Sequence, residues 1–154
     1  MDFYLFLSWK SNEFNVLLPR PLEMYQKSWS VALIDISFNN SFFIIKEQKK
    51  NEEKNNIAIN KPNVIHINKV MDIQCNFVQQ SIVNNNFKSI LSRIPINNEE
   101  KIFLKITNPI YIPVLKDTYT HFHFQLFTLD ENKPFPIANN SDVFITLHFK
   151  CNNE

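Results

Sequence analysis

Residues 102–150, IFLKITNPIYIPVLKDTYTHFHFQLFTLDENKPFPIANNSDVFITLHFK, decide the fold class of this chain. Short runs rich in Ile, Phe, Val, Thr and Tyr alternate there with polar or proline-containing clusters. Such runs, broken at short intervals, are typical of β-strands in a sandwich. We therefore expect strands at Ile102–Thr107, Tyr119–Leu129 and Asp142–Phe149, with a turn at Asp130–Pro134.

The first half of the chain repeats this pattern. Asp2–Trp9 alternates as a strand, with Tyr4 and Phe6 on the side opposite Phe3, so both of its faces are expected to be covered. Val70–Val78 has a clean period of two that places Cys75 on its buried side. These runs extend the predicted β-structure to both ends of the chain.

Ser28–Phe38 is the most apolar of the predicted strands. Strict alternation puts Trp29, Val31 and Leu33 on one face. Asp35 continues this face, so we expect the face to reach solvent near the end of the strand. The opposite face carries Ala32, Ile34, Ile36 and Phe38.

Other segments give weaker predictions. Phe14–Leu18 is a short strand that stops at Pro19 and Pro21, and these prolines mark a bend or a sheet edge because they fix φ and lack an N–H. Phe87–Ile94 fits one turn of helix or an extended segment equally well. Further short strands are predicted at Phe42–Lys46, Ile57–Ile59 and Val64–Ile67.

About eight to ten strands, with no convincing long helix and no repeat, predict one all-β domain over residues 1–154. An antiparallel two-sheet sandwich, a single jelly roll, fits best. The polar run at residues 47–56 is expected to be an exposed loop. The predicted core includes Trp29, Val31, Leu33, Ile73, Cys75, Phe77, Phe122, Phe124, Phe144 and Leu147.

Composition limits the classes of function that the chain can have. The 154 residues carry a formal net charge of +1, which gives no electrostatic case for nucleic-acid binding. The N-terminus has no basic region and only a short apolar run, so we expect neither a signal peptide nor a membrane span. Cys75 and Cys151 could form one bridge, but a reducing compartment favours two free thiols.

Glycine is absent from the sequence. Asparagine occupies the places where turns are expected, and after glycine it is the residue that best tolerates positive φ. We therefore expect asparagine to build the turns. The pairs and triplets lie at residues 39–40, 55–56, 84–86, 97–98 and 139–140.

Metal chemistry has one candidate group. His121 and His123 project from the same face of a predicted strand, and His66, His148 or Cys151 could complete a zinc site with them. The alternative is two histidines on the wetter face of that strand, and we favour it because no zinc-binding motif occurs. No metal or cofactor site is predicted.

Catalytic motifs are not found either. The chain has no G-x-S-x-G motif, and without glycine it cannot form a glycine-rich phosphate loop. Its aspartates, Asp72, Asp117, Asp130 and Asp142, do not pair at informative spacings. A carbohydrate platform of Trp9, Tyr25 and Trp29 stays open beside core packing for Trp29. We predict no catalytic residues and therefore no enzyme.

Three blocks resemble one protein family. Residues 3–38 contain LPRPL and WSVALIDI, residues 70–96 contain IQCNFV and LSRIP, and residues 111–150 contain PFPI and VFITLHFK. Together they resemble the minor capsid, or penton, proteins of Polinton/Maverick-type elements and adintovirus-like viruses. Where the family commonly has glycine, this chain has Asn84 and Asn132, and asparagine can hold the same backbone shape.

The resemblance implies a structural protein, a single jelly roll that forms homopentamers at the vertices of an icosahedral capsid. Its implied partner is a double jelly-roll major capsid protein, and its place is the virion, after synthesis in the host cytoplasm or nucleus. A jelly-roll module that binds carbohydrate or a receptor is the alternative, and a small hydrolase is a third. The candidate subunit contacts are Pro19, Pro21, Asn39, Asn40, Asp130, Pro134 and Phe135.

Overall fold

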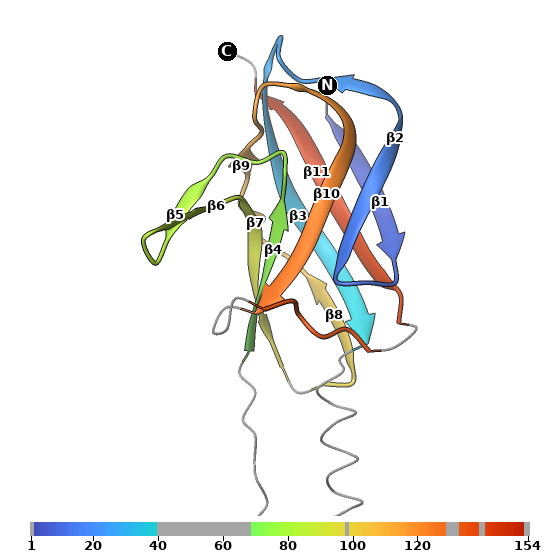
Figure 1. Cartoon of the computed structure of the whole chain (residues 1–154). Helices are drawn as coiled ribbons and strands as arrows, with labels where there is room; N and C mark the ends of the chain where they lie inside the picture. Colours follow the sequence, from blue (N-terminus) through green and yellow to red (C-terminus); the bar gives the residue numbers. More distant parts are fainter. Residues whose placement is uncertain (1, 40–68, 98, 129–132, 139–140, 153–154) are drawn as a thin grey trace, which may run out of the picture.

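The computed structural model describes residues 2–39, 69–97, 99–128, 133–138 and 141–152. Two antiparallel sheets pack face to face (Figure 1). The first sheet, sheet A, has the order β1-β11-β3-β8, and the short β9 also pairs with β3. Its strands are β1 (Phe3–Trp9), β11 (Val143–Asn152), β3 (Ser28–Asn39), β8 (Lys101–Lys105) and β9 (Ile112–Pro113).

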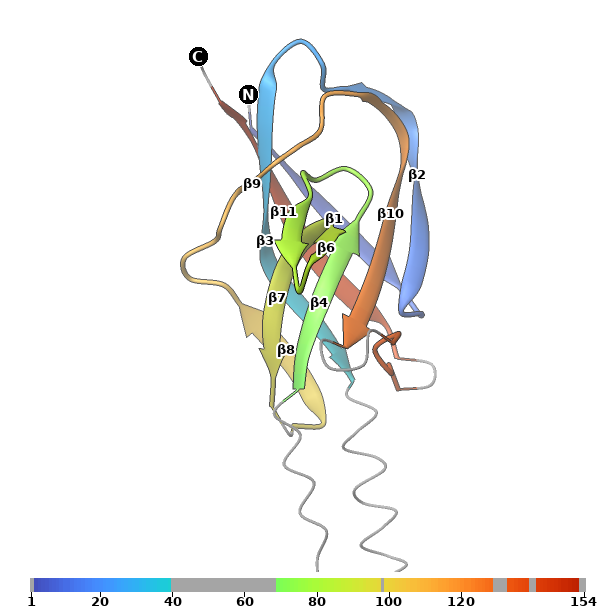
Figure 2. The ribbon, with the colours of Figure 1, turned by 60° about the vertical axis from the view of Figure 1, so that its left-hand side comes forward.

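The second sheet, sheet B, has the order β2-β10-β4-β7. A separate two-stranded hairpin of β5 and β6 stands off from the sandwich in Figure 1, and in the turned view of Figure 2 it lies in front of the sandwich, beside β4 and β7. The strands of sheet B are β2 (Glu13–Glu23), β10 (Thr118–Thr128), β4 (Lys69–Cys75) and β7 (Ile90–Ile96). The hairpin consists of β5 (Ser81–Val83) and β6 (Asn86–Lys88).

The strand order defines the topology. From β1 to β4 the chain changes sheet at every connection. It then passes through the separate β5–β6 hairpin, returns to sheet B at β7, and changes sheet again to β8, β10 and β11. Eight long strands, four in each sheet, with this connectivity form a single jelly roll, to which the short β9 adds a fifth strand in sheet A. The predicted all-β sandwich is therefore confirmed.

The core lies between the two sheets and is rich in phenylalanine. Phe77 contacts Phe122 at a ring-centroid distance of 4.2 Å and Phe149 at 5.8 Å, so aromatic side chains of both sheets meet at the centre. All three side chains are buried. Burial of each such ring stabilises the fold by roughly 1.5–3 kcal/mol.

The core prediction is right for most residues and wrong for Phe144. Phe144 is half exposed on the outer face of β11, because the inward positions of that strand are Val143, Ile145 and Leu147. Phe144 and Leu147 are three positions apart, so they cannot share a face of one strand. Trp29 is partly buried at the edge of the core.

The predicted faces of β3 hold only for its first half. The pairing with β11 passes from Leu33–Leu147 to Asp35–Thr146, so Ile34 is an extra residue at a β-bulge. Beyond the bulge the inward positions become Ile36 and Phe38, both of which are buried. A bulge of one residue thus exchanges the two faces of the strand.

Two other segments differ from their predicted form. β2 does not stop at Pro19 but continues to Glu23, because it is an edge strand and a missing N–H costs no ladder bond on the open side. The predicted edge is thus confirmed. The ambiguous segment at residues 87–94 is extended and contributes to β6 and β7.

The turn between β5 and β6 shows how this chain builds a tight turn without glycine. Val83 pairs with Asn86, so the loop consists of Asn84 and Asn85, with φ angles of 48° and 66°. Positive φ at both residues is the requirement of a two-residue type I′ hairpin. The prediction that asparagine replaces glycine in turns is confirmed here.

Candidate assembly surface

The histidines do not gather at one point. His121 and His123 both lie on the outer face of sheet B, where His123 Nε2 lies 3.2 Å from Glu13 Oε1 and its Nδ1 2.8 Å from Asn15 Oδ1. His148 lies on β11 in sheet A, and His66 falls outside the described residues. Within the described ranges, no three His, Cys, Asp or Glu side chains are grouped as metal ligands.

The aspartates have separate local partners. Asp72 is bound by Arg93, Asp142 lies 3.9 Å from Lys10 Nζ, and the Asp117 carboxylate accepts the N–H of Thr118 at 2.7 Å. Asp130 falls outside the described residues. These three carboxylates are thus used in ion pairs or a turn cap.

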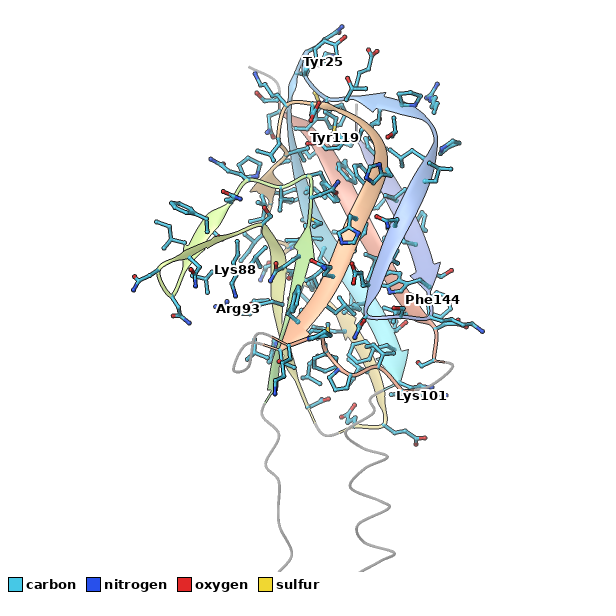
Figure 3. The ribbon with its side chains drawn as sticks, in the orientation of Figure 1. Tyr25, Lys88, Arg93, Lys101, Tyr119 and Phe144 are labelled. Carbon is cyan, nitrogen blue, oxygen red and sulfur yellow. The ribbon has the colours of Figure 1, made fainter. Side chains whose placement is uncertain are left out.

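The aromatic residues considered as a carbohydrate platform do not share a face. Trp9 stacks on Phe14 at the β1–β2 end of the sandwich, whereas Trp29 makes an edge contact with Phe3. Tyr25 lies near the opposite end of the sandwich from Phe144 (Figure 3). This arrangement does not form the platform that the sequence left open.

Both cysteines are buried free thiols, as expected. Burial raises the pKa of the Cys75 thiol to about 12, so this side chain stays protonated near neutral pH. Burial also raises the pKa of Tyr119 to about 12, and its hydroxyl donates to the carbonyl of Leu115 at 2.8 Å. Neither side chain is placed or ionised as a nucleophile.

The most distinctive surface is the outer face of sheet A. Four aromatic side chains point outward there, from β1, β11 and β8, and we call them the aromatic face. They are Tyr4, Phe6, Phe103 and Phe144, with exposed fractions of 57%, 75%, 75% and 50%. Tyr4 and Phe6 contact at a centroid distance of 6.3 Å.

The strand register makes the aromatic face continuous. Phe144 lies opposite Ser8, one inter-strand diagonal from Phe6, and Ser37 separates Phe144 from Phe103. A hollow of about 390 Å³ lies between these two phenylalanines, with Lys101 and Asp142 among its lining residues. The small Ser37 side chain forms part of its lining, so the hollow is a shallow socket with aromatic walls.

Polar contacts cover the other end of this face. Tyr111, from the segment before β9, places its hydroxyl 2.7 Å from His148 Nδ1, while Tyr4 stacks on the same imidazole at 4.5 Å. Asp2 Oδ2 lies 3.8 Å from His148 Nε2. Among the described parts of this face, the end near Phe103 and Phe144 therefore combines exposed aromatic rings with a hollow.

A second hollow, of about 680 Å³, opens at the other side of the molecule. It lies under the β5–β6 hairpin, between the free edges of β7 and β8, and its lining includes Ile82, Leu91, Leu104 and Ile110. Ile82 and Phe87 are a directly opposed pair on the hairpin, 71% and 69% exposed. Figure 1 shows the hairpin extending beyond the sandwich.

The predicted subunit contacts are not gathered in one patch. Pro19 and Pro21 are exposed on β2, Asn39 is half-buried at the end of β3, and Pro134 is exposed beside Phe127. Phe135 is a core residue with no exposed surface, and it contacts Phe38 at 5.7 Å, so it is unsuited to a subunit contact. Asn40 and Asp130 fall outside the described residues.

The aromatic face and the hairpin were missed as surfaces. Alternation placed Tyr4 and Phe6 opposite Phe3, but both faces of that strand were expected to be covered. Within the described ranges only one face is covered, because no further sheet of these residues packs on the outer side of sheet A. A strand that is apolar on both faces was the signal that could have identified this surface.

Comparison with known proteins agrees with the topology. The chain shares its single jelly-roll fold with a solved structure. It is similar over its length to the crystal structure of selenomethionine-labelled mavirus penton protein, with a TM-score of 0.68 and 10% sequence identity. The match covers 99% of this chain and 100% of the other. No family model and no curated sequence matches.

The described residues contain no helix that is long and apolar enough to cross a membrane.

Proposed function

We propose that this protein is a structural capsid subunit that forms the pentameric vertices of an icosahedral virus or virus-like element. The observation that carries the proposal is the full-length likeness to the mavirus penton protein. It agrees with the independent resemblance of three sequence blocks to penton proteins of Polinton/Maverick-type elements and adintovirus-like viruses. A shared fold alone does not define a function, so the proposal also depends on the surface.

The surface supports an assembling protein rather than an isolated domain. Monomers rarely expose contiguous apolar patches beyond a few hundred square ångströms, and larger ones mark interaction sites. The four side chains of the aromatic face are at least half exposed, on the side of sheet A that faces away from sheet B. A formal net charge of +1 also limits repulsion among copies around one axis.

The remaining elements of the proposal follow from this role. The protein acts without catalysis, its partner is a double jelly-roll major capsid protein, and its location is the virion. Pro19, Pro21, Asn39, Asn40, Asp130 and Pro134 remain proposed contacts, whereas Phe135 is withdrawn because it is buried. The loop at residues 47–56, which lies outside the described residues, is proposed to be dispensable for assembly.

The test is the mass of the purified protein, measured by light scattering over a range of concentrations. We expect five chains per particle, and incorporation into capsids when the protein is co-expressed with its major capsid partner. Deleting residues 47–56 should leave both results unchanged. A protein that stays monomeric at high concentration and also fails to join capsids would exclude the vertex role and favour the binding-module alternative.

A further inference from the structure

A closed ring of five copies imposes a condition on each chain. Every subunit contacts two neighbours through two different surfaces, because a surface that pairs with its own copy closes as a twofold dimer and cannot continue the ring. The chain therefore needs two separate apolar patches that fit one another. The exposed apolar side chains of the described residues form two such patches.

The aromatic face is the first patch. A buried aromatic side chain removes 150–250 Å² from solvent, so the four partly exposed rings present about 500 Å². A standard interface buries about 800 Å² on each partner, and the polar side chains around the rings supply the difference. The four rings thus supply more than half of the area that a standard contact needs on one partner.

The hairpin is the second patch, and we call β5, β6 and the turn between them the arm. It carries the exposed pair Ile82 and Phe87. Ile110, which is 77% exposed, lines the hollow under the hairpin together with Ile82. The remaining exposed apolar side chains, Leu17, Tyr25 and Leu115, come from three other segments. Among the described residues, the arm is therefore the apolar feature best suited to partner the aromatic face.

The shape of the arm fits this role. Its two-residue asparagine turn is short, and its strands pair only with one another within the described ranges. The aromatic face supplies a hollow between Phe103 and Phe144. Figure 3 shows Phe144 on a different side of the sandwich from Lys88, which belongs to the arm. A preformed projection and a preformed hollow lose little conformational freedom on binding.

We propose that the arm of one copy docks on the aromatic face of the next copy, with Phe87 seated between Phe103 and Phe144. This contact rests on the proposed pentamer and gives it a specific interface. Phe87 acts as the anchor residue, and Ile82 packs beside it. Tyr4 and Phe6 extend the contact along the face, so each subunit offers one arm and accepts another.

Two double variants and a control test the contact. The arm variant carries Ile82→Ser and Phe87→Ser, the face variant carries Phe103→Ser and Phe144→Ser, and the control carries Leu17→Ser. All five side chains are at least half exposed, so each variant should keep the wild-type circular dichroism and unfolding midpoint. By light scattering, the wild type and the control should contain five chains, and each double variant one chain.

Mixing the two double variants tests whether the arm of one chain binds the aromatic face of another, rather than some other pair of surfaces. The arm variant keeps an intact face and the face variant keeps an intact arm, so an equimolar mixture should form particles of two chains and no larger species. A five-chain arm variant would overturn the proposal, as would a mixture that stays monomeric. A wild type that is itself monomeric would instead refute the proposed pentamer.

A cross-link provides a second measurement that does not depend on loss of assembly. One chain carries Phe87→Cys and a second carries Phe103→Cys, and the native thiols are buried. Mild oxidation of the mixture should produce a covalent pair of the two different chains. Pairing Leu17→Cys with Phe103→Cys is the control and should give no product. Equal yields from both mixtures would refute the docking of the arm on the face.

Discussion

Arg93 on β7 holds the carboxylate of Asp72 on β4 through two parallel hydrogen bonds, Nε to Oδ1 at 2.7 Å and Nη2 to Oδ2 at 3.1 Å. The two residues are register partners, and the Asp72 side chain is only 2% exposed. The hydrogen bond to Asp72 raises the pKa of Arg93, so the guanidinium stays charged. The pair therefore ties the edge strand of sheet B to its neighbour.

Replacing Arg93 with Ala should reduce the free energy of unfolding by about 3 kcal/mol, because it leaves the buried Asp72 carboxylate without its partner. Urea unfolding measures the change. Arg93→Lys should recover only part of the loss, since an ammonium cannot make two parallel bonds to a carboxylate. A loss under 1 kcal/mol for Arg93→Ala would mean that water satisfies Asp72.

Replacing Phe124 with Ala should cost roughly 3–5 kcal/mol, because its ring is fully buried and the cavity cannot collapse completely. The ring stacks on Phe14 at 4.8 Å and meets Phe77 edge-on at 5.5 Å. Phe144→Ala is the matched control in an exposed site and should change stability by less than about 0.5 kcal/mol. Similar costs at both sites would contradict the inward and outward directions of these strands.

Stability should fall as pH rises above 9, because two buried groups resist ionisation. The pKa of Cys75 rises from 9.0 to about 12 and that of Tyr119 from 10.0 to about 12. Between these values the unfolded chain releases protons that the folded chain keeps, so the stability present below pH 9 is lost progressively towards pH 12. Urea midpoints at pH 8, 9 and 10 measure the fall.

Cys75→Ala is the control for this pH dependence. The substitution removes the thiol contribution, so stability should fall less steeply between pH 9 and 10 than in the wild type. In the folded wild-type protein, Cys75 should also resist alkylation at pH 8 and react only after unfolding. Rapid alkylation of Cys75 in the folded state would contradict its burial.

Replacing Asn84 with Val should destabilise the β5–β6 turn, because a β-branched residue strongly disfavours the φ angle of 48° that Asn84 adopts. Asn84→Gly should preserve the turn, since glycine reaches positive φ without steric cost. Amide hydrogen exchange at Val83 and Asn86 is the measurement: faster exchange is expected only in the Val variant. Equal protection in both variants would show that the turn does not depend on positive φ.

Replacing His121 and His123 together with Gln should leave the fold and the assembled mass nearly unchanged. Their contacts lie on the outer face of β10, where His123 approaches Glu13, and exposed ion pairs contribute about 0–1 kcal/mol. Thermal unfolding and light scattering check both expectations. One tightly held zinc ion per chain, found by elemental analysis of the wild type, would restore the metal-site alternative.

Local pattern was enough to predict the class of the fold. The alternation of Met71, Ile73, Cys75 and Phe77 was sufficient to place their side chains in the core, where the structure has them. It was not sufficient for β3, because the bulge at Ile34 depends on the pairing with β11, more than 100 residues away in the sequence. Periodicity describes one strand, whereas register belongs to a pair of strands.

The assembly surfaces were harder to predict for a related reason. Phe144 and Phe124 are the same residue type in similar strands, and only the sheet order shows that one points to the core and the other to solvent. Likewise, Ile82 and Phe87 carry no pattern that separates a projecting hairpin from a buried one. Exposure of an apolar side chain is a property of the assembled sandwich.

The position of β11 also determines when the protein can fold. This strand lies between β1 and β3, and its register with β1 pairs Phe149 with Phe3. During synthesis, both neighbours therefore leave the ribosome long before the strand that joins them. Until β11 emerges, sheet A has no centre, so premature release of the chain leaves two apolar strands with open edges, which are prone to aggregate. Sheet A can therefore be completed only after β11 has been synthesised.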